Sequence, residues 1–120
     1  MNEVKYPVIV RINGQQSYKW LTLEQANARF VVVNNRLVAN NVEPLSLEYC
    51  QFLLERSQKS REDYLVEFED LCSDIEQYQE TNNRLVLEYL QPKLDRVKSD
   101  IKKSEQDIDF LTKAFDFLNN

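Results

Sequence analysis

The sequence predicts an α+β fold in which a small N-terminal β-hairpin module of ββαββ outline precedes a long antiparallel helical hairpin, or coiled coil. In residues 1–45, short runs of β-branched and aromatic residues alternate with asparagine-containing turns. From residue 46 onward, apolar residues recur at alternating steps of three and four, which is the period of packed helices. No linker rich in proline or serine separates the two parts, so we expect residues 1–45 and 46–120 to pack together as one domain.

The first expected hairpin surrounds Asn13 and Gly14, the single glycine of the chain. Residues 8–12 before this pair and residues 18–21 after it are dense in β-branched and aromatic side chains. An Asn-Gly pair between two such runs favours a hairpin, because both residues tolerate positive φ. The second run begins only after Ser17, so we expect a longer loop over residues 13–17 instead of a two-residue turn.

A short helix should follow the first hairpin. Thr22 and Gln25 have the spacing of a capping box, in which each side chain accepts a hydrogen bond from the backbone N–H of the other residue. We therefore expect a helix from about residue 23 to residue 28 or 29.

The second expected hairpin pairs residues 30–33 with residues 36–38 around Asn34 and Asn35. Asparagine is the residue after glycine that best accepts the left-handed conformation of a tight turn. The stretch from Asn40 to Pro44 should end the module.

Two heptad patterns predict the helical hairpin. In a heptad, apolar residues three and four positions apart line one narrow strip of a helix, along which a second helix packs. The first strip has polar interruptions at Ser57 and Arg61, and the second has one at Ser104. The first strip comprises Leu47, Cys50, Leu54, Ser57, Arg61, Tyr64, Phe68, Leu71, Ile75 and Tyr78. The second comprises Leu87, Leu90, Leu94, Val97, Ile101, Ser104, Ile108, Leu111, Phe115 and Leu118.

The break between the two helices can lie at either of two places in the sequence. A turn at residues 80–83 gives helices of matched length, 46–79 and 84–119, that can pair along their whole length. The alternative is a single helix from residue 46 to about residue 90, with Pro92 in the first turn of the next helix, where proline is harmless. We expect the turn at 80–83 because of the length match and the Asn82-Asn83 pair.

Composition argues against catalysis and against a bound cofactor or metal. The chain has no histidine, the commonest general acid–base group and zinc ligand, and its one glycine rules out a glycine-rich phosphate loop. Cys50 and Cys72 are too far apart for a metal-binding pair and fall on or beside the helical strip, as small core residues would. We therefore expect a protein that is not an enzyme.

Acidic residues dominate the first expected helix. The helical part, residues 46–120, carries a net charge of −7, whereas residues 1–45 carry +2. No basic residue lies between Arg61 and Arg84, and we expect the acidic residues there to bind a basic surface of another protein. The alternative is a solvated helix face, neutralised by Lys93, Arg96, Lys98, Lys102 and Lys103 of the second helix. The candidate partner-binding residues are Glu62, Asp63, Glu67, Glu69, Asp70, Asp74 and Glu76.

Four apolar residues outside the main strips are candidates for self-association. A two-helix hairpin is thin, so Leu65 and Cys72 should remain exposed on its outer flank in a monomer. Phe110 and Phe117 lie one heptad apart and either contact a second chain or bury against the β-hairpins. A homo-oligomer, most simply a dimer, is the expected form.

These observations lead us to expect a non-enzymatic interaction protein of adaptor or inhibitor type. A small-ligand or nucleotide binder, with its site between the β-module and the helices or between subunits, is one alternative, and an acidic mimic of nucleic acid is another. Binding to nucleic acid itself is not expected, because the net charge is −5 and the N-terminal bases and aromatic residues are sparse. No apolar run reaches the length of a membrane span, so no membrane partner is expected. The two cysteines do not form a disulfide framework, and reduced thiols lead us to expect a cytoplasmic location.

Overall fold

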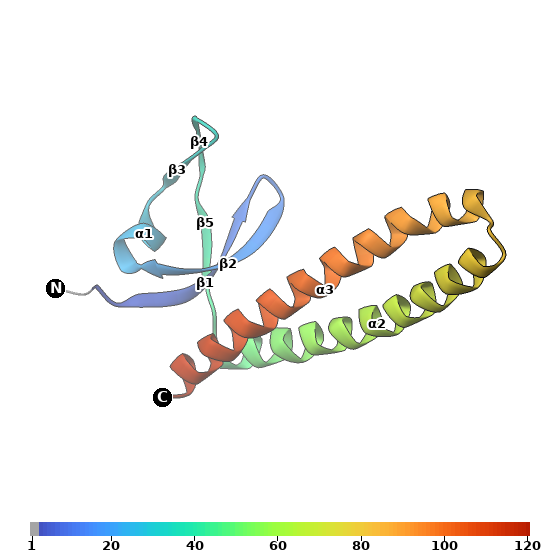
Figure 1. Ribbon diagram of the computed structural model, residues 1–120. Coiled ribbons are helices and arrows are strands. Elements are labelled where there is room, and N and C mark those ends of the chain that lie inside the picture. The colour runs from blue at the N-terminus through green and yellow to red at the C-terminus, as the bar shows by residue number, and fades with distance from the viewer. Residues whose placement is uncertain (1–2) are drawn as a thin grey trace. The chain divides into compact units, whose positions relative to one another are not determined.

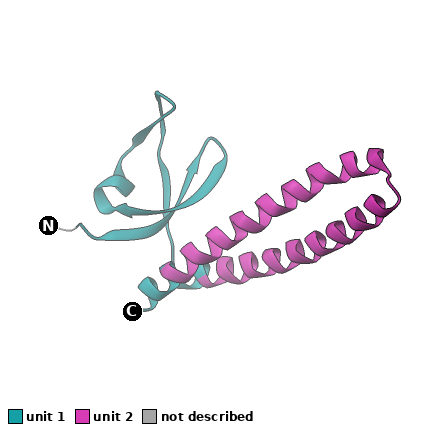
Figure 2. Ribbon diagram, in the orientation of Figure 1, with its two compact units in different colours: residues 1–50, 114–120 teal, residues 51–113 magenta. Residues whose placement is uncertain are grey.

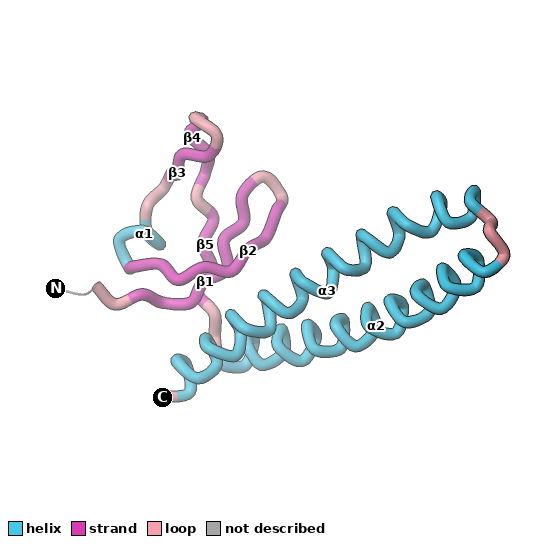
Figure 3. Tube along the Cα trace, viewed as in Figure 1, coloured by secondary structure: helices cyan, strands magenta, loops and turns pink. Residues whose placement is uncertain are grey.

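The computed structural model describes residues 3–120 and shows an α+β protein (Figures 1 and 3). It confirms the predicted order of a small β-rich part followed by two long paired helices. The elements are β1 (Lys5–Ile12), β2 (Gln15–Thr22), α1 (Leu23–Asn27), β3 (Phe30–Val33), β4 (Arg36–Ala39), β5 (Asn41–Pro44), α2 (Leu47–Glu80) and α3 (Arg84–Asn119).

The first hairpin has a two-residue turn, so the expected longer loop over residues 13–17 is wrong. Asn13 and Gly14 have φ values of 52° and 77°, and β1 and β2 pair without interruption up to Ile12 and Gln15. Two consecutive residues at positive φ match the right-handed twist of the flanking strands. This geometry lets the polar residues 15–17 join the ladder, although their sequence has no strand propensity.

The capping box forms as predicted at the start of α1. The Gln25 backbone N–H donates to Thr22 Oγ1 over 3.2 Å, and the Thr22 N–H donates to Gln25 Oε1 over 3.0 Å. The helix ends at Asn27, slightly earlier than expected, because Ala28 is already extended. Asn40 Nδ2 donates to the Ala28 carbonyl oxygen over 2.7 Å and to that of Gln25 over 3.2 Å, and so satisfies two carbonyl groups at this helix end.

The second hairpin forms around Asn34 and Asn35, whose φ values are 52° and 63°. Beyond it lies a further strand, β5, which the sequence pattern does not predict. β5 pairs antiparallel with β1 and gives a three-stranded sheet of order β2-β1-β5. Its sequence, Asn-Val-Glu-Pro, is poor in strand formers, but β5 is an edge strand with Pro44 at its end, where a missing N–H is tolerated.

The chain divides into two compact units (Figure 2), and the first contains residues 1–50 and 114–120. Residues 7–10 of the central strand β1 are all buried, and Ile9 is fully buried. Since successive side chains of a strand point to opposite faces, both faces of the sheet are covered at these residues. The Phe117 ring lies edge-on to the rings of Tyr6 and Trp20, with centroid distances of 6.0 and 5.5 Å. The last turns of α3 therefore contribute an aromatic side chain to the packing of this unit.

The second unit, residues 51–113, contains most of α2 and α3, which run antiparallel (Figure 3). The helix break lies at residues 81–83, as predicted, and Pro92 lies inside α3. Asn82 has a φ of 56°, the Asn83 N–H donates to the Tyr78 carbonyl over 3.0 Å, and the Asn82 N–H donates to that of Gln79 over 3.1 Å. This is the Schellman pattern of helix termination, with asparagine at the left-handed position.

Both predicted strips form the contact between the helices. Every residue of the two heptad series is buried or half-buried. In the second unit a cluster of Leu71, Leu90, Leu94 and Val97 is buried, with the Tyr64, Phe68, Ile75 and Ile101 side chains packed against it.

Replacing Asn40 by alanine should destabilise the first unit by about 1 kcal/mol, because the carbonyl groups of Gln25 and Ala28 lose their hydrogen-bond donor. The single tryptophan, Trp20, lies in β2 of this unit, so its fluorescence during urea unfolding measures the change. Asn41→Ala is the matched control, since no side-chain hydrogen bond of Asn41 is present. Equal stability of both variants would contradict the assigned role of Asn40.

Candidate functional site

The acidic residues singled out in the sequence lie together on the solvent-facing surface of α2. Glu62, Asp63, Glu67, Glu69, Asp70, Asp74, Glu76 and also Glu80 are all exposed. We call these eight side chains the acidic surface. Within residues 3–120, none of them has a lysine or arginine nitrogen within 4 Å. The acidic surface is therefore hydrated and free of direct ion pairs.

An apolar side chain lies at the centre of the acidic surface. Val66 is 60% exposed. Glu62 and Asp63 precede it by one helical turn, and Glu69 and Asp70 follow it by one turn. Residues three and four positions apart are neighbours on a helix surface, so four carboxylates surround Val66. The sequence analysis missed this residue, although the heptad register already places position 66 opposite the packed strip.

The basic residues of α3 do not neutralise the acidic surface by ion pairs. Lys93 lies over the ring of Tyr89, with Nζ 4.3 Å from the ring centroid. The hydrogen bond from Lys93 and its positive charge lower the pKa of the Tyr89 phenol. Tyr89 is 65% exposed and Leu85, one turn earlier, is 80% exposed. The N-terminal half of α3 thus carries its own surface of exposed apolar and basic side chains.

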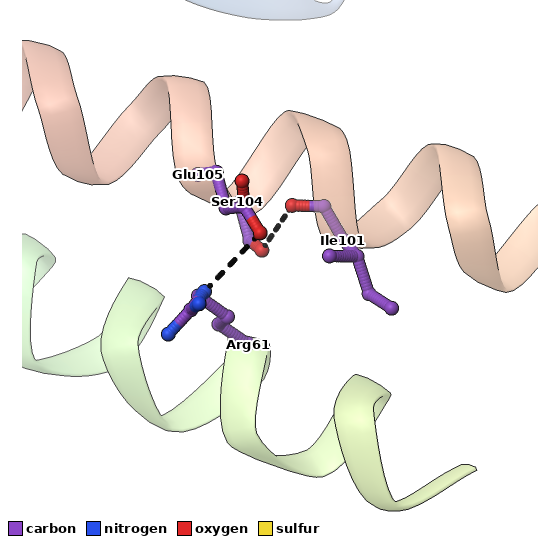
Figure 4. A network of polar contacts seen from close by, with 4 residues as sticks. All are labelled: Arg61, Ile101, Ser104 and Glu105. Atoms are coloured by element: carbon purple, nitrogen blue, oxygen red, sulfur yellow. Dashed lines mark hydrogen bonds and ion pairs between the residues drawn. The ribbon is translucent and has the colours of Figure 1, made fainter. Parts of the chain in front are cut away.

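Two polar residues of the helical strips, Arg61 and Ser104, take part in hydrogen bonds and an ion pair that Figure 4 shows. Arg61 Nε lies 3.4 Å from Glu105 Oε1 across the two helices, and the buried Ser104 donates to the Ile101 carbonyl oxygen over 2.7 Å. A polar hollow of 550 Å³ adjoins this network. It is lined by Gln58, Arg61, Glu62, Glu105, Ile108, Asp109 and Thr112. In the described part of the chain no group of three acidic or cysteine side chains has the arrangement of a metal site, here or elsewhere.

The four candidates for self-association have different surroundings. Leu65 and Cys72 are half-buried, and Cys72 packs against the Leu71 cluster, so neither is as exposed as the sequence analysis expected. Phe110 is also half-buried. Phe117 is 39% exposed and contacts Tyr6 and Trp20, which corresponds to the alternative in which it packs on the β-hairpins. Besides Phe117, the large exposed apolar groups of α2 and α3 are Phe52, Val66, Leu85 and Tyr89.

The first unit contains a hollow of 400 Å³ at its hairpin turns and a pocket of 210 Å³, and only the smaller pocket lies below the range of about 300–1,000 Å³ typical of small-molecule sites. Its polar groups are Lys19, Gln25 and Asn40. Gln25 and Asn40 are already engaged in the end contacts of α1. This pocket is therefore a weaker candidate than the acidic surface.

Comparison with known proteins gives this chain no relative. No protein-family model, no curated protein and no solved structure matches it. None of the helices in residues 3–120 combines the length and apolar character that crossing a membrane would require.

Replacing Asp107 by asparagine should stabilise the protein at neutral pH. Burial raises the pKa of Asp107, against a smaller opposing effect of Lys103. A folded-state pKa above the unfolded value means that this carboxyl favours folding most below its ordinary pKa of about 4 and loses that contribution as the pH rises. The gain from Asp107→Asn should therefore be present near pH 7 and absent near pH 3 in urea unfolding followed by circular dichroism.

Asp109→Asn is the matched control for this pH dependence. Asp109 is exposed and pairs with Lys113 over 3.1 Å one turn away. Its replacement should cost no more than about 0.5 kcal/mol at neutral pH. A gain from Asp107→Asn that persists at low pH would exclude the burial of its charge as the cause.

Proposed function

We propose that this chain is a non-enzymatic interaction protein, of adaptor or inhibitor type, whose acidic surface on α2 binds a basic surface of another protein chain. The observation that carries the proposal is the run of eight exposed carboxylates on one helix, none of them in an ion pair. Carboxylates that only stabilised the fold would be expected to meet bases on the adjacent helix, as Glu105 meets Arg61.

Charge of a single sign acts on a partner in a specific way. It raises the rate of encounter with an oppositely charged surface and excludes like-charged proteins, and it contributes less to the final affinity. Affinity comes mainly from apolar groups at the centre of an interface, with polar groups around them. Val66 and its four surrounding carboxylates have this arrangement on a small scale.

Self-association is the second part of the proposal. The hairpin exposes large apolar side chains on its outer surface, among them Leu85 and Tyr89. Exposed apolar groups that cluster with charged residues are typical of protein interfaces. Neither Cys50 nor Cys72 is in a disulfide, which fits the reducing environment of the cytoplasm, the location we propose.

The combined change of Glu69, Asp70 and Glu76 to lysine should slow association with a basic partner and leave the fold intact. All three side chains are exposed, so their replacement leaves the helical strip unchanged. Partners are first identified by affinity purification from the source cells, and the association rate with the purified partner is then measured at low and high salt. For the original protein the rate should fall as salt screens the charges, and for the variant it should rise.

The control variant carries Glu3→Lys, Glu24→Lys and Asp116→Lys. These residues are also exposed, and the change in net charge is identical, but they lie outside α2. The control should keep most of the association rate at low salt. A folded α2 variant with an unchanged rate at low salt would exclude the acidic surface as the binding site.

A further inference from the structure

The two helices of the hairpin carry opposite charges along one flank of their contact. On α2 this flank has an exposed acidic row with heptad spacing, Asp63, Glu67, Asp70 and Asp74. On α3 the matching flank has exposed apolar and basic residues, and the half-buried Asp100 is its one acidic member among residues 85–103. We call this second set the basic–aromatic row. It comprises Tyr89, Lys93, Arg96 and Lys103 on this flank, together with Leu85, which lies one turn before Tyr89 and nearer the outer face of the helix.

Both rows lie on the same side of the hairpin. Asp63 and Asp70 each come directly before a residue of the apolar strip of α2, and Tyr89 and Arg96 each come directly before a residue of the apolar strip of α3. The four residues therefore occupy the same heptad position. Because α2 and α3 run antiparallel, equal heptad positions of the two helices flank the same side of their contact (Figure 1). One broad side of the hairpin is therefore half acidic and half basic–aromatic.

Within residues 3–120 the charges of the two rows form no ion pair, although Lys93 lies over the ring of Tyr89. Across residues 3–120, no member of the acidic row lies within 4 Å of a lysine or arginine nitrogen, and neither Lys93, Arg96 nor Lys103 forms an ion pair. The basic–aromatic row also leaves two large apolar groups in solvent, Leu85 and Tyr89. A surface with these two halves is complementary to itself after a twofold rotation, which is the requirement for an isologous dimer.

We infer that the hairpin docks on a second copy of this chain, the acidic row of α2 in each copy facing the basic–aromatic row of α3 in the other. The inference rests on the proposed function, since it names one basic surface that the acidic surface of α2 binds. Four antiparallel-paired helices result, with Leu85 and Tyr89 covered and the charges of both rows matched across the interface. The dimer uses part of the acidic surface, so a second copy and a basic partner of another kind compete for it.

The test uses three variants of the full chain and the mass in solution from light scattering coupled to gel filtration. The acid-reversed variant carries Asp63→Lys, Asp70→Lys and Asp74→Lys. The base-reversed variant carries Lys93→Glu, Arg96→Glu and Lys103→Glu. The flank control carries Glu62→Lys, Glu69→Lys and Glu76→Lys, which changes the net charge as the acid-reversed variant does but on the other flank of the same helix. All nine residues are exposed, and circular dichroism verifies that each variant keeps its helices.

The original protein and the flank control should have twice the chain mass of 14.3 kDa at tens of micromolar in low salt. Each reversed variant alone should be a monomer, with self-association weakened by about a hundredfold or more, because like charges then face each other. An equimolar mixture of the two reversed variants should restore a dimer, and native mass spectrometry should show that it holds one copy of each. Tyr89→Ala, which changes no charge, should also weaken the dimer.

A monomeric original protein, a reversed variant that remains dimeric, or a mixture that fails to pair would each overturn the inference. Loss of the dimer in the flank control would do so as well, because it would show a general effect of charge. None of these results decides whether the acidic surface binds a basic partner of another kind, so the association-rate experiment tests the proposed function separately.

Discussion

The narrow apolar strip between α2 and α3 is the constraint on which the rest of the helical hairpin depends. Two helices bury only one strip each, so the stability of the second unit comes from the residues along that line, with Leu71, Leu90, Leu94 and Val97 at its centre. The exposed positions on the outer side of the two helices, among them those of the acidic surface, take no part in this packing. Selection for a surface property can therefore act on those positions without disturbing the fold.

Asparagine occupies most of the positive-φ positions in this chain, a conformation that glycine usually adopts in other proteins. Within residues 3–120, positive φ occurs at Gly14 and at Asn13, Asn34, Asn35 and Asn82. These residues make the turns of both β-hairpins and the end of α2. The positions of these turns were predictable from the sequence because asparagine tolerates the left-handed conformation and stood between segments of clear periodicity, but the two-residue length of the first turn was not. The same reasoning correctly put the helix break at residues 80–83 instead of at Pro92.

The parts that the sequence did not predict are those decided by tertiary contacts. β5 has little strand propensity of its own and exists because β1 offers it an open edge. Residues 15–17 join β2 because a two-residue turn brings them opposite β1. The acidic surface could be predicted from residue spacing alone, since exposure on a helix follows from the heptad register. The absence of ion pairs to α3, and the contacts of Phe117 with Tyr6 and Trp20, depend on side-chain geometry that no periodicity encodes.

The acidic surface has an energetic cost that bears on its role. Like charges three or four residues apart on a helix destabilise it by about 0.2–0.5 kcal/mol per pair, and α2 contains several such pairs, among them Asp63 with Glu67 and Asp70 with Asp74. The isolated hairpin tolerates this repulsion because the apolar strip stabilises it. A basic surface that covers α2 removes the repulsion and adds attraction, so charge that weakens the free chain strengthens the complex. Complementary charge on α3 of a second copy would relieve the same repulsion. Self-association and partner binding would therefore both be favoured by the repulsion among the carboxylates of α2.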